Sequence, residues 1–386
     1  MLNKWTRIAL IPSLVVAGFV LWLHLADVPE TQIANQTSVE SNSRDSGLAA
    51  ESLNRSSGGL FSAQQELVDR MFGELELLKL VHGEAEGQEA IQSMFTWLAQ
   101  APRSDASAAV TKVLASGEDA FAFGRFAPGA DGFLKAYPTF RTALLDVLEM
   151  LDPAQAVEVS KAILNTSENP DEWALSLRIM SKHSESAQDE VFLQAKVQAL
   201  LNKDEWLNEP SFAYLHAFDA AVQDGQFITI QRLGELVSDS PNRAVGHAAT
   251  LSVDRFFQIH SDVGVSCVIN QPGFLEDAAG FRATLMARVN PASPREMNAV
   301  QNYLQGNQFS DQEKRTFLET FPNFNSTYSY NLITGSLLLS RGEMRERSIA
   351  ALSQLKGWLN ENRYPEFEDE INNTASRLIK TWKLEL

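Results

Sequence analysis

The chain has 386 residues, of which 44% are hydrophobic and 21% are charged, and this balance is typical of a folded protein rather than a disordered one. Its 49 acidic and 32 basic residues give a formal charge of -17, which disfavours nucleic acid as a partner because phosphate binding requires lysine and arginine. The single cysteine, Cys267, excludes an intrachain disulfide and a cysteine-based metal site, and its apolar neighbours predict a buried, inert thiol.

The N-terminal segment carries the strongest signal for localisation. Residues 8–26 form an apolar run that, at about 1.5 Å per residue, is close to the ~30 Å thickness of a bilayer core. Lys4 and Arg7 precede this run, and acidic residues follow it. The positive-inside rule therefore predicts a single-pass signal anchor with residues 1–7 in the cytoplasm and the rest of the chain outside it, in the periplasm if the cell is Gram-negative.

A cleaved signal peptide is the alternative interpretation of this segment. Cleavage after Ala26 would require a small residue two positions earlier, but His24 stands there. The apolar run is also longer than the usual signal-peptide core of about 7–15 residues. Both observations favour a retained membrane helix.

Residues 27–62 are predicted to be a disordered linker. The segment is rich in serine, contains the pair Gly58-Gly59 and has few large apolar residues, so it cannot bury enough surface to offset the entropy of ordering. A coil of this length has a root-mean-square span of roughly 30–35 Å. We expect it to hold the folded domain near the membrane.

The remainder, residues 63–386, is predicted to be a helical domain that could divide near 240–275. Apolar residues recur with a period near 3.6, beginning with Leu67, Met71 and Leu75. Only residues 227–230 and 263–269 have the composition of strands, and the first of these continues into a helical pattern. The domain is therefore expected to be all-α.

Helix starts are marked by a capping residue placed before a proline. This pattern occurs at Asp152-Pro153, Asn169-Pro170, Ser240-Pro241 and Ser293-Pro294, and weaker starts are expected at Pro138, Pro210 and Pro365. Capping boxes are expected to include Glu172, Glu296 and Glu313, and Ser62 with Gln65 is expected to open the first helix of the domain.

Short connections between helices of about four turns predict antiparallel hairpins, which either close into a bundle or stack into a superhelix. The sequence of residues 169–173 recurs in degenerate form at 202–206, and this spacing favours stacking. In helix length and spacing, residues 62–386 resemble the broad α-solenoid class, either HEAT-like or tetratricopeptide-like. The tetratricopeptide signature is absent, so the resemblance concerns architecture and implies no functional residues.

No motif specifies a reaction. The histidines do not pair at helical spacing, and neither a phosphate-binding loop nor a nucleophile elbow occurs, so no metal, cofactor or catalytic residue is predicted. Ser353 and Lys356 match Ser-x-x-Lys, but the companion motifs of the penicillin-binding families are missing and a solvated helix face is expected. The acidic run 366–370 is interpreted as the first turn of a helix rather than a calcium loop.

Two irregular aromatic stretches are candidate surfaces for binding a protein partner. Residues 121–140 form a long connection between helices, and residues 321–330 mix aromatic rings with amides and hydroxyls. Long connections are often functional, although the same rings could instead fill gaps in the core. The candidate residues are Phe121, Phe123, Phe126, Phe133, Tyr137, Phe321, Phe324, Tyr328 and Tyr330.

A tethered helical domain without a catalytic signature predicts a non-catalytic scaffold or adaptor that binds other envelope proteins. One alternative is a membrane-anchored folding factor, because the lipase-foldase family has a similar layout, although its Arg-x-x-Phe-Asp-Tyr motif is absent. Another is a peptidoglycan-cleaving enzyme. Lytic transglycosylases include helical superhelices, but Glu185-Ser186 lacks the downstream segment that their catalytic glutamate requires.

Overall fold

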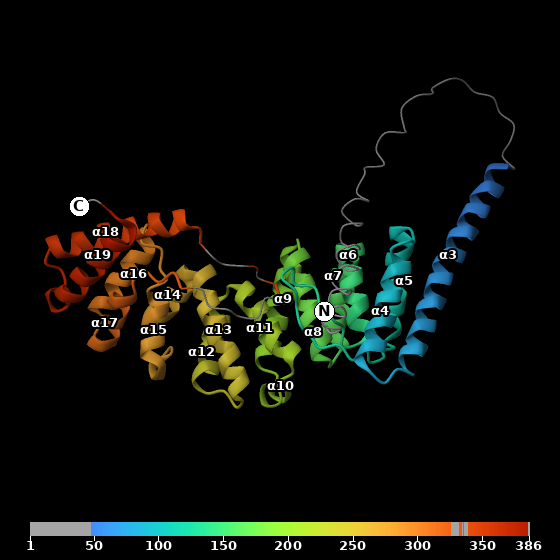
Figure 1. Cartoon of the computed structure of the whole chain (residues 1–386), viewed down its shortest axis with the longest axis horizontal. Helices are drawn as coiled ribbons and strands as arrows, with labels where there is room; N and C mark the ends of the chain where they lie inside the picture. Colours follow the sequence, from blue (N-terminus) through green and yellow to red (C-terminus); the bar gives the residue numbers. More distant parts are fainter. Residues whose placement is uncertain (1–47, 326–331, 334, 336–338, 385–386) are drawn as a thin grey trace, which may run out of the picture. The chain divides into compact units, whose positions relative to one another are not determined.

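The computed structural model describes residues 48–325, 332, 333, 335 and 339–384, with side chains from residue 63 onward. Within these ranges the chain is all-helical, as predicted, and contains no strand (Figure 1). Two isolated antiparallel bridges, Phe121 with Thr139 and Pro128 with Leu134, lie in one connection. None of the helices in these ranges combines the length and the apolar character needed to span a bilayer.

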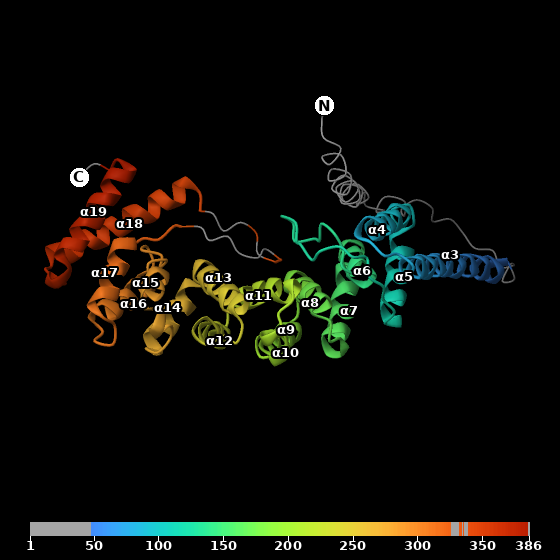
Figure 2. The same ribbon diagram turned by 60° about the horizontal axis from the view of Figure 1, so that its bottom comes forward.

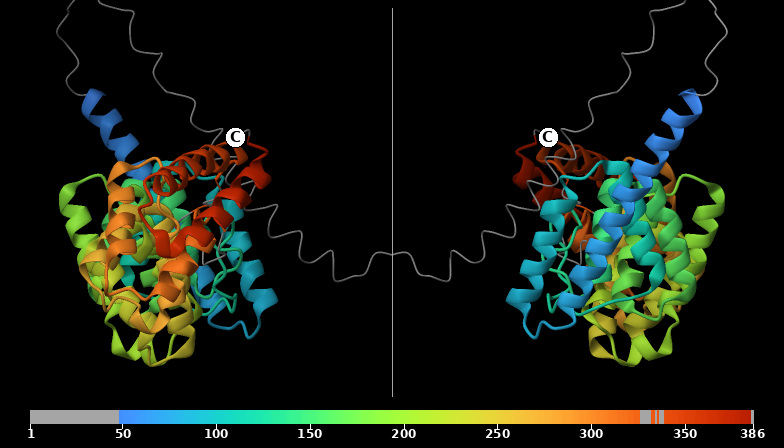
Figure 3. Two further views of the ribbon diagram at one scale, coloured as in Figure 1. Left: turned by 90° about the vertical axis from the view of Figure 1, so that its left-hand side faces the viewer. Right: turned by 90° about the vertical axis from the view of Figure 1, so that its right-hand side faces the viewer.

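The predicted anchor 8–26, the N-terminal residues 1–7 and residues 27–47 of the predicted linker lie outside the described residues. The rest of that linker belongs to helix α3 (Leu48–Leu78). Ser62 therefore lies within a helix, and the expected capping box of Ser62 with Gln65 does not open one. The N-terminal turns of α3 extend past α4 and α5 (Figure 3).

The chain divides into two compact units, Met1–Ser186 and Ala187–Leu386. The first unit comprises α3 followed by α4 (Glu84–Leu98), α5 (Arg103–Ser116), α6 (Phe140–Leu151), α7 (Pro153–Thr166) and α8 (Pro170–His183). Helices α4, α6 and α8 pack side by side in one layer, and α3, α5 and α7 form the other. This is a stack of antiparallel hairpins.

The boundary that the sequence suggested near 240–275 lies inside the second unit, which by itself also consists of two layers of helices. Helices α11 (Phe212–Asp224), α13 (Arg243–Ile259), α15 (Ala279–Met286), α17 (Asp311–Thr320) and α19 (Glu368–Trp382) follow one another in one layer. The other layer contains α9 (Ala187–Leu201), α12 (Phe227–Ser238), α14 (Ser261–Asn270) and α16 (Pro294–Gln305). The remaining elements are α10 (Asp204–Asn208), η1 (Glu276–Ala278), η2 (Pro365–Phe367) and α18 (Arg341–Asn360), which packs on α19.

Several predicted helix starts are confirmed. Asp152, Asn169, Ser293 and Ser310 each accept a backbone N–H of the first turn through the side chain. The prediction at Ser240-Pro241 is wrong by two residues, because Asn242 caps α13 instead. Near Pro138 and Pro210 the caps are Thr139 and Ser211, which follow the prolines.

The expected capping boxes at Glu172, Glu296 and Glu313 do not form. The Glu172 carboxylate pairs with Arg141, and the Glu313 carboxylate pairs with Arg282. Glu296 accepts the backbone N–H of Asn290 at 2.9 Å. A carboxylate that can bind a buried guanidinium gains more than one that caps an exposed helix end, so the tertiary partner prevails.

Buried arginine–carboxylate pairs link successive helices of one layer. In the first unit, Arg141 and Arg178 join α6 to α8 by pairing with residues 31 and 32 positions away. In the second unit, Arg282 pairs across 31 positions and Arg288 across 34. These separations are the length of one helical hairpin, so each pair fastens a hairpin to the next.

Candidate functional site

The connection 117–139 joins α5 to α6 and lies over the layer of α4, α6 and α8 (Figure 2). Gln88 of α4 fastens it, because its side-chain amide donates to the carbonyl oxygens of Ala122 and Tyr137 at 2.8 Å each. Gly124 permits the close approach, since a Cβ there would lie 2.6 Å from the nitrogen of Tyr137. The connection is therefore held against α4 in a defined position.

A buried ionic cluster lies under this connection. The Arg178 guanidinium, which is 0% exposed, donates from Nη2 to Asp146 Oδ1 at 2.7 Å and from Nε to Glu149 Oε2 at 3.0 Å. Burial opposes ionisation of Glu149, but the charge of Arg178 prevails and lowers the pKa of that carboxyl. For Asp146 burial is the larger effect and raises the pKa.

The same cluster binds the main chain of the connection. Arg178 Nη1 donates to the carbonyl oxygen of Gly132 at 2.8 Å, and Asp146 Oδ2 accepts the backbone N–H of Leu134 at 2.9 Å. The ring of Phe133, between these two residues, lies 4.9 Å from the Arg178 guanidinium carbon. We call this arrangement a main-chain clamp. In it an aspartate accepts a backbone N–H, and an arginine donates to the carbonyl oxygen of the residue two positions earlier.

A second ion pair binds the last turn of α5, just before the connection. Arg141 pairs with Glu172 and donates from Nη1 to the carbonyl oxygen of Leu114 at 2.6 Å. Asp119 accepts the backbone N–H of Arg141 at 2.9 Å, and burial raises the pKa of its carboxyl. The start of the connection is thus bound to α6 through Asp119, and its later part is bound by Asp146 of α6 and Arg178 of α8.

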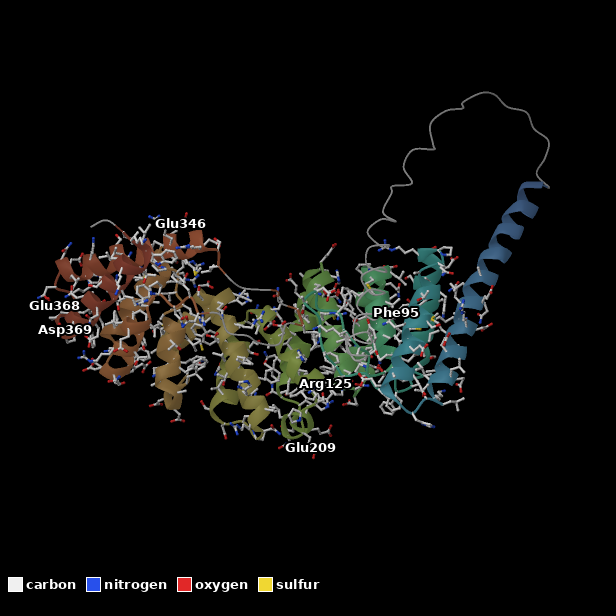
Figure 4. All side chains as sticks on the ribbon, viewed as in Figure 1. Phe95, Arg125, Glu209, Glu346, Glu368 and Asp369 are labelled. Carbon is white, nitrogen blue, oxygen red and sulfur yellow. The ribbon has the colours of Figure 1, made fainter. Side chains whose placement is uncertain are left out.

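The predicted aromatic candidates of this connection fall into two groups. Phe126 and Tyr137 are buried, and the Tyr137 ring packs edge-on against Phe95 of α4 with centroids 5.3 Å apart. Figure 4 labels Phe95 among the helices of the first unit and Arg125 on the connection. Phe133 is half-buried, with its ring against the Arg178 guanidinium. Only Phe121 and Phe123 present exposed rings.

Phe121 and Phe123 form an exposed aromatic pair. Their side chains are 70% and 42% exposed, and their ring centroids are 6.0 Å apart. Phe123 has a φ of 60°, a left-handed conformation that is an outlier for a bulky residue and that costs on the order of 1–3 kcal/mol. Core packing does not account for two exposed rings, one of them on a strained backbone, so the pair is a candidate contact site.

Exposed acidic residues lie near this pair in the chain and on helix α4, and the exposed Arg125 follows the pair. Glu118 precedes it in the connection, is exposed and pairs with Lys79 at 3.2 Å. The first turn of α4, which touches the connection where Gly87 lies against Ala122, carries exposed Glu84 and Glu86. Apolar rings near exposed acidic side chains are complementary to a segment that carries apolar and basic side chains.

The candidates of the second aromatic stretch lie in the second unit. Phe321 is buried and stacks on Phe317, with centroids 5.3 Å apart, and Phe324 is half-buried. Tyr328 and Tyr330 lie outside the described residues. The described part of this stretch is bound to the neighbouring helices through its main chain.

The second unit also has an open groove of about 540 Å³ between α12 and residues 271–277. Its lining includes Glu235, Asp239, Glu276 and Asp277, together with Arg232, which donates to Glu235 at 2.8 Å. In the part of the chain that the structure describes, no group of three or more histidine, cysteine or acidic side chains could hold a metal ion.

The buried ion pairs are not apparent from any local motif. A usable signal exists, because Asp146 and Arg178 each interrupt an apolar stretch, between Leu145 and Val147 and between Leu177 and Ile179. A charge at a core position of a helix is rarely tolerated unless it is paired. Opposite charges at such positions one hairpin apart could therefore have been matched from sequence.

Comparison with family models, with curated proteins and with solved structures gives no match. The described residues thus define an all-α class of stacked antiparallel hairpins, and function has to be argued from the site itself.

Proposed function

We propose that this protein is a membrane-tethered, non-catalytic scaffold that binds a partner protein of the cell envelope through the Phe121–Phe123 pair. The observation that carries the proposal is an exposed aromatic pair on a connection fixed by buried charged side chains. Aromatic residues supply much of the binding energy at protein interfaces, and a pre-ordered surface loses little entropy on binding.

The surroundings of the pair indicate what kind of partner it fits. Residues 63–186 include 19 acidic and 10 basic residues. Opposite charge on the partner would speed association and favour the correct orientation. A partner segment with apolar residues flanked by lysine or arginine is the complement that this surface calls for.

The architecture supports the same function. Hairpins stacked in two layers within each unit resemble HEAT-like and tetratricopeptide-like arrays, whose extended surfaces serve protein binding. The apolar run 8–26 would place this surface outside the cytoplasm and near the membrane.

An enzymatic role receives less support. The buried glutamates Glu149, Glu172, Glu296 and Glu313 are each engaged in an ion pair or hydrogen bond with the surrounding helices. None of them is among the residues that line the groove of the second unit. A peptidoglycan-cleaving enzyme would need a carboxyl group directed into a cleft, with its pKa raised there.

Site-specific photocrosslinking in intact cells tests the contact. A photoreactive phenylalanine analogue would replace Phe121 or Phe123 in the full-length chain, and Lys135, exposed on the same connection, is the matched control position. We expect one discrete adduct from positions 121 and 123 and none from 135. The adduct at position 121 should disappear when Phe123 is changed to Ser, and an adduct pattern that ignores position would refute the proposal.

Fractionation tests the tether separately. The full-length chain is expected to remain in the membrane pellet after alkaline extraction, whereas a chain that lacks residues 1–26 should be released. Recovery of the intact chain in the cytosol would contradict this part of the proposal.

A further inference from the structure

Two leucines at the C-terminal end of α3 are exposed to the same degree as the Phe121–Phe123 pair. Leu77 is 58% exposed and Leu80 is 73% exposed. Among residues 63–186, these two leucines and the two phenylalanines are the large apolar side chains that are exposed. Apolar residues exposed singly need no explanation, but here the exposed set comes from only two short segments, 77–80 and 121–123.

An ion pair and a close backbone contact show that these two segments are neighbours. Lys79, which lies between the leucines in the chain, donates from Nζ to Glu118 Oε2 at 3.2 Å. The pair is exposed and adds little stability, but its length places the turn after α3 beside the start of the connection. Gly87 of α4 lies against Ala122, between the phenylalanines, because a Cβ there would be 2.4 Å from the Ala122 carbonyl oxygen. We call the four exposed side chains, Leu77, Leu80, Phe121 and Phe123, the Leu–Phe surface.

The Leu–Phe surface offers side chains, while much of its main chain is already paired. In the connection, the N–H of Ala122 donates to the carbonyl oxygen of Pro138 at 2.8 Å. At the end of α3, the N–H of Leu80 donates to the carbonyl oxygen of Leu77 at 3.0 Å. An extended strand binds by adding to an unpaired backbone edge, whereas an amphipathic helix needs apolar side chains against which its own can pack. The surface therefore fits a helix.

The charges near the Leu–Phe surface indicate which helix fits it. The exposed carboxylates outnumber the cations, because Lys79 is already bound to Glu76 at 2.7 Å and to Glu118, and Arg125 is the other exposed cation of these segments. The carboxylates are those of Glu76, Glu84, Glu86 and Glu118. Such a surface repels anionic lipid headgroups and attracts a helix that carries lysine or arginine beside its apolar stripe.

We propose that the Leu–Phe surface binds a basic amphipathic helix of the partner protein. The apolar stripe of that helix packs on the two leucines and the two phenylalanines, and its flanking lysine or arginine residues face the glutamates. The inference rests on the proposed function, since it extends the Phe121–Phe123 contact to the end of α3 and specifies the segment of the partner that is bound.

Peptide binding to the full-length chain tests the chemistry of the surface. The probe is a fluorescein-labelled synthetic peptide of about 18 residues, with leucines three and four positions apart and lysines elsewhere. A second peptide has leucine and lysine in strict alternation, and a third has glutamate in place of lysine. Fluorescence anisotropy should show the first peptide binding at least about tenfold more tightly than either of the others. Equal binding of the alternating or the acidic peptide overturns the proposal.

Substitutions in both segments test whether they form one site. Leu77→Ser with Leu80→Ser, and separately Phe121→Ser, should each weaken binding of the first peptide at least about fivefold, with an unchanged circular dichroism spectrum. Val191 of the second unit, which is 66% exposed, supplies the matched control, because Val191→Ser removes an exposed apolar side chain outside the surface. An effect from only one of the two segments, or an equal effect from Val191→Ser, overturns the proposal.

Crosslinking in intact cells separates this inference from the proposed function. A photoreactive phenylalanine analogue at position 80 should give an adduct of the same size as the analogue at position 121, and its crosslinked peptide should have apolar residues at helical spacing among lysines or arginines. An absence of adducts from positions 121 and 123 would refute the proposed function. An adduct from position 121 without one from position 80 would overturn the helix site alone, as would an adduct with lipid or with a second copy of this chain.

Discussion

Arg282 of α15 and Glu313 of α17 form a two-bond ion pair in the interior of the second unit. Nε and Nη2 of the guanidinium each lie 2.8 Å from one carboxylate oxygen, and both side chains are 2% exposed. The Tyr303 hydroxyl donates to the same carboxylate at 2.9 Å. Glu313 therefore links two hairpins through Arg282 instead of forming the predicted capping box with Ser310.

Removing one member of this pair should strongly destabilise the second unit. Glu313→Ala leaves the Arg282 guanidinium buried without its counter-charge, and we expect a loss of about 3–5 kcal/mol in the free energy of unfolding, measured by urea titration. The double variant Arg282→Met with Glu313→Leu should recover most of that loss.

The exposed pair Arg295–Asp262, at 3.3 Å, is the matched control. Asp262→Ala should change the free energy of unfolding by less than about 1 kcal/mol, because water screens an exposed pair. If Glu313→Ala and Asp262→Ala had equal effects, burial would not be what gives the Arg282–Glu313 pair its importance.

Two phenylalanines of the connection 117–139 should respond oppositely to truncation. Phe126 is 5% exposed, so Phe126→Ala removes buried apolar surface and should cost about 3–5 kcal/mol. Phe121 is 70% exposed, so Phe121→Ala should lower the free energy of unfolding by less than about 1 kcal/mol. The partner adduct formed from position 123 should nevertheless be lost. Urea unfolding and crosslinking of the same two variants separate stability from binding, and a large stability loss in Phe121→Ala would assign that ring to the fold.

His216 of α11 should make the second unit sensitive to acid. Burial lowers the pKa of His216 to about 4 from its ordinary 6.5. Between these values the unfolded chain binds a proton that the folded chain does not, so stability falls as the pH drops from about 6.5 towards 4. The loss of stability between pH 7 and pH 4.5 should be smaller by up to about 3 kcal/mol in His216→Gln than in the unchanged chain. Urea unfolding at the two pH values measures this difference. Identical pH profiles for the two proteins would contradict the assignment.

Asp171, in the first turn of α8, should act in the opposite sense. Burial, with the charges of Asp119 and Glu172, raises the pKa of Asp171 to about 6. The folded chain then holds a proton that the unfolded chain releases, so stability falls as the pH rises from about 4 through 6. Asp171→Asn should stabilise the protein by about 1–2 kcal/mol at pH 7, after allowance for the lost helix-dipole interaction, and should give no gain at pH 4. A destabilised variant at pH 7 would show that the carboxylate makes a favourable contact there.

The local sequence determined many of the helix starts, although α3 begins inside the segment that was predicted to be a disordered linker. A period of 3.6 residues and a capping side chain depend only on neighbours within one or two turns, so starts such as those at Asp152 and Ser293 follow from the sequence. The degenerate repeat was less informative. Residues 169–173 begin the long helix α8, whereas residues 202–206 lead into α10, which has five residues.

The tertiary structure decided which charges are buried and which rings are exposed. Glu172 pairs with Arg141 instead of forming its predicted capping box, and Asp219 pairs with Arg255 of another helix. Burying a charge is tolerated only where another hairpin supplies a partner of opposite charge. Phe121 and Phe126 are the same residue type and lie five positions apart, yet Phe121 is exposed and Phe126 is buried. Sequence periodicity fixes the face of a helix, but in an irregular connection only the surrounding helices determine where each side chain lies.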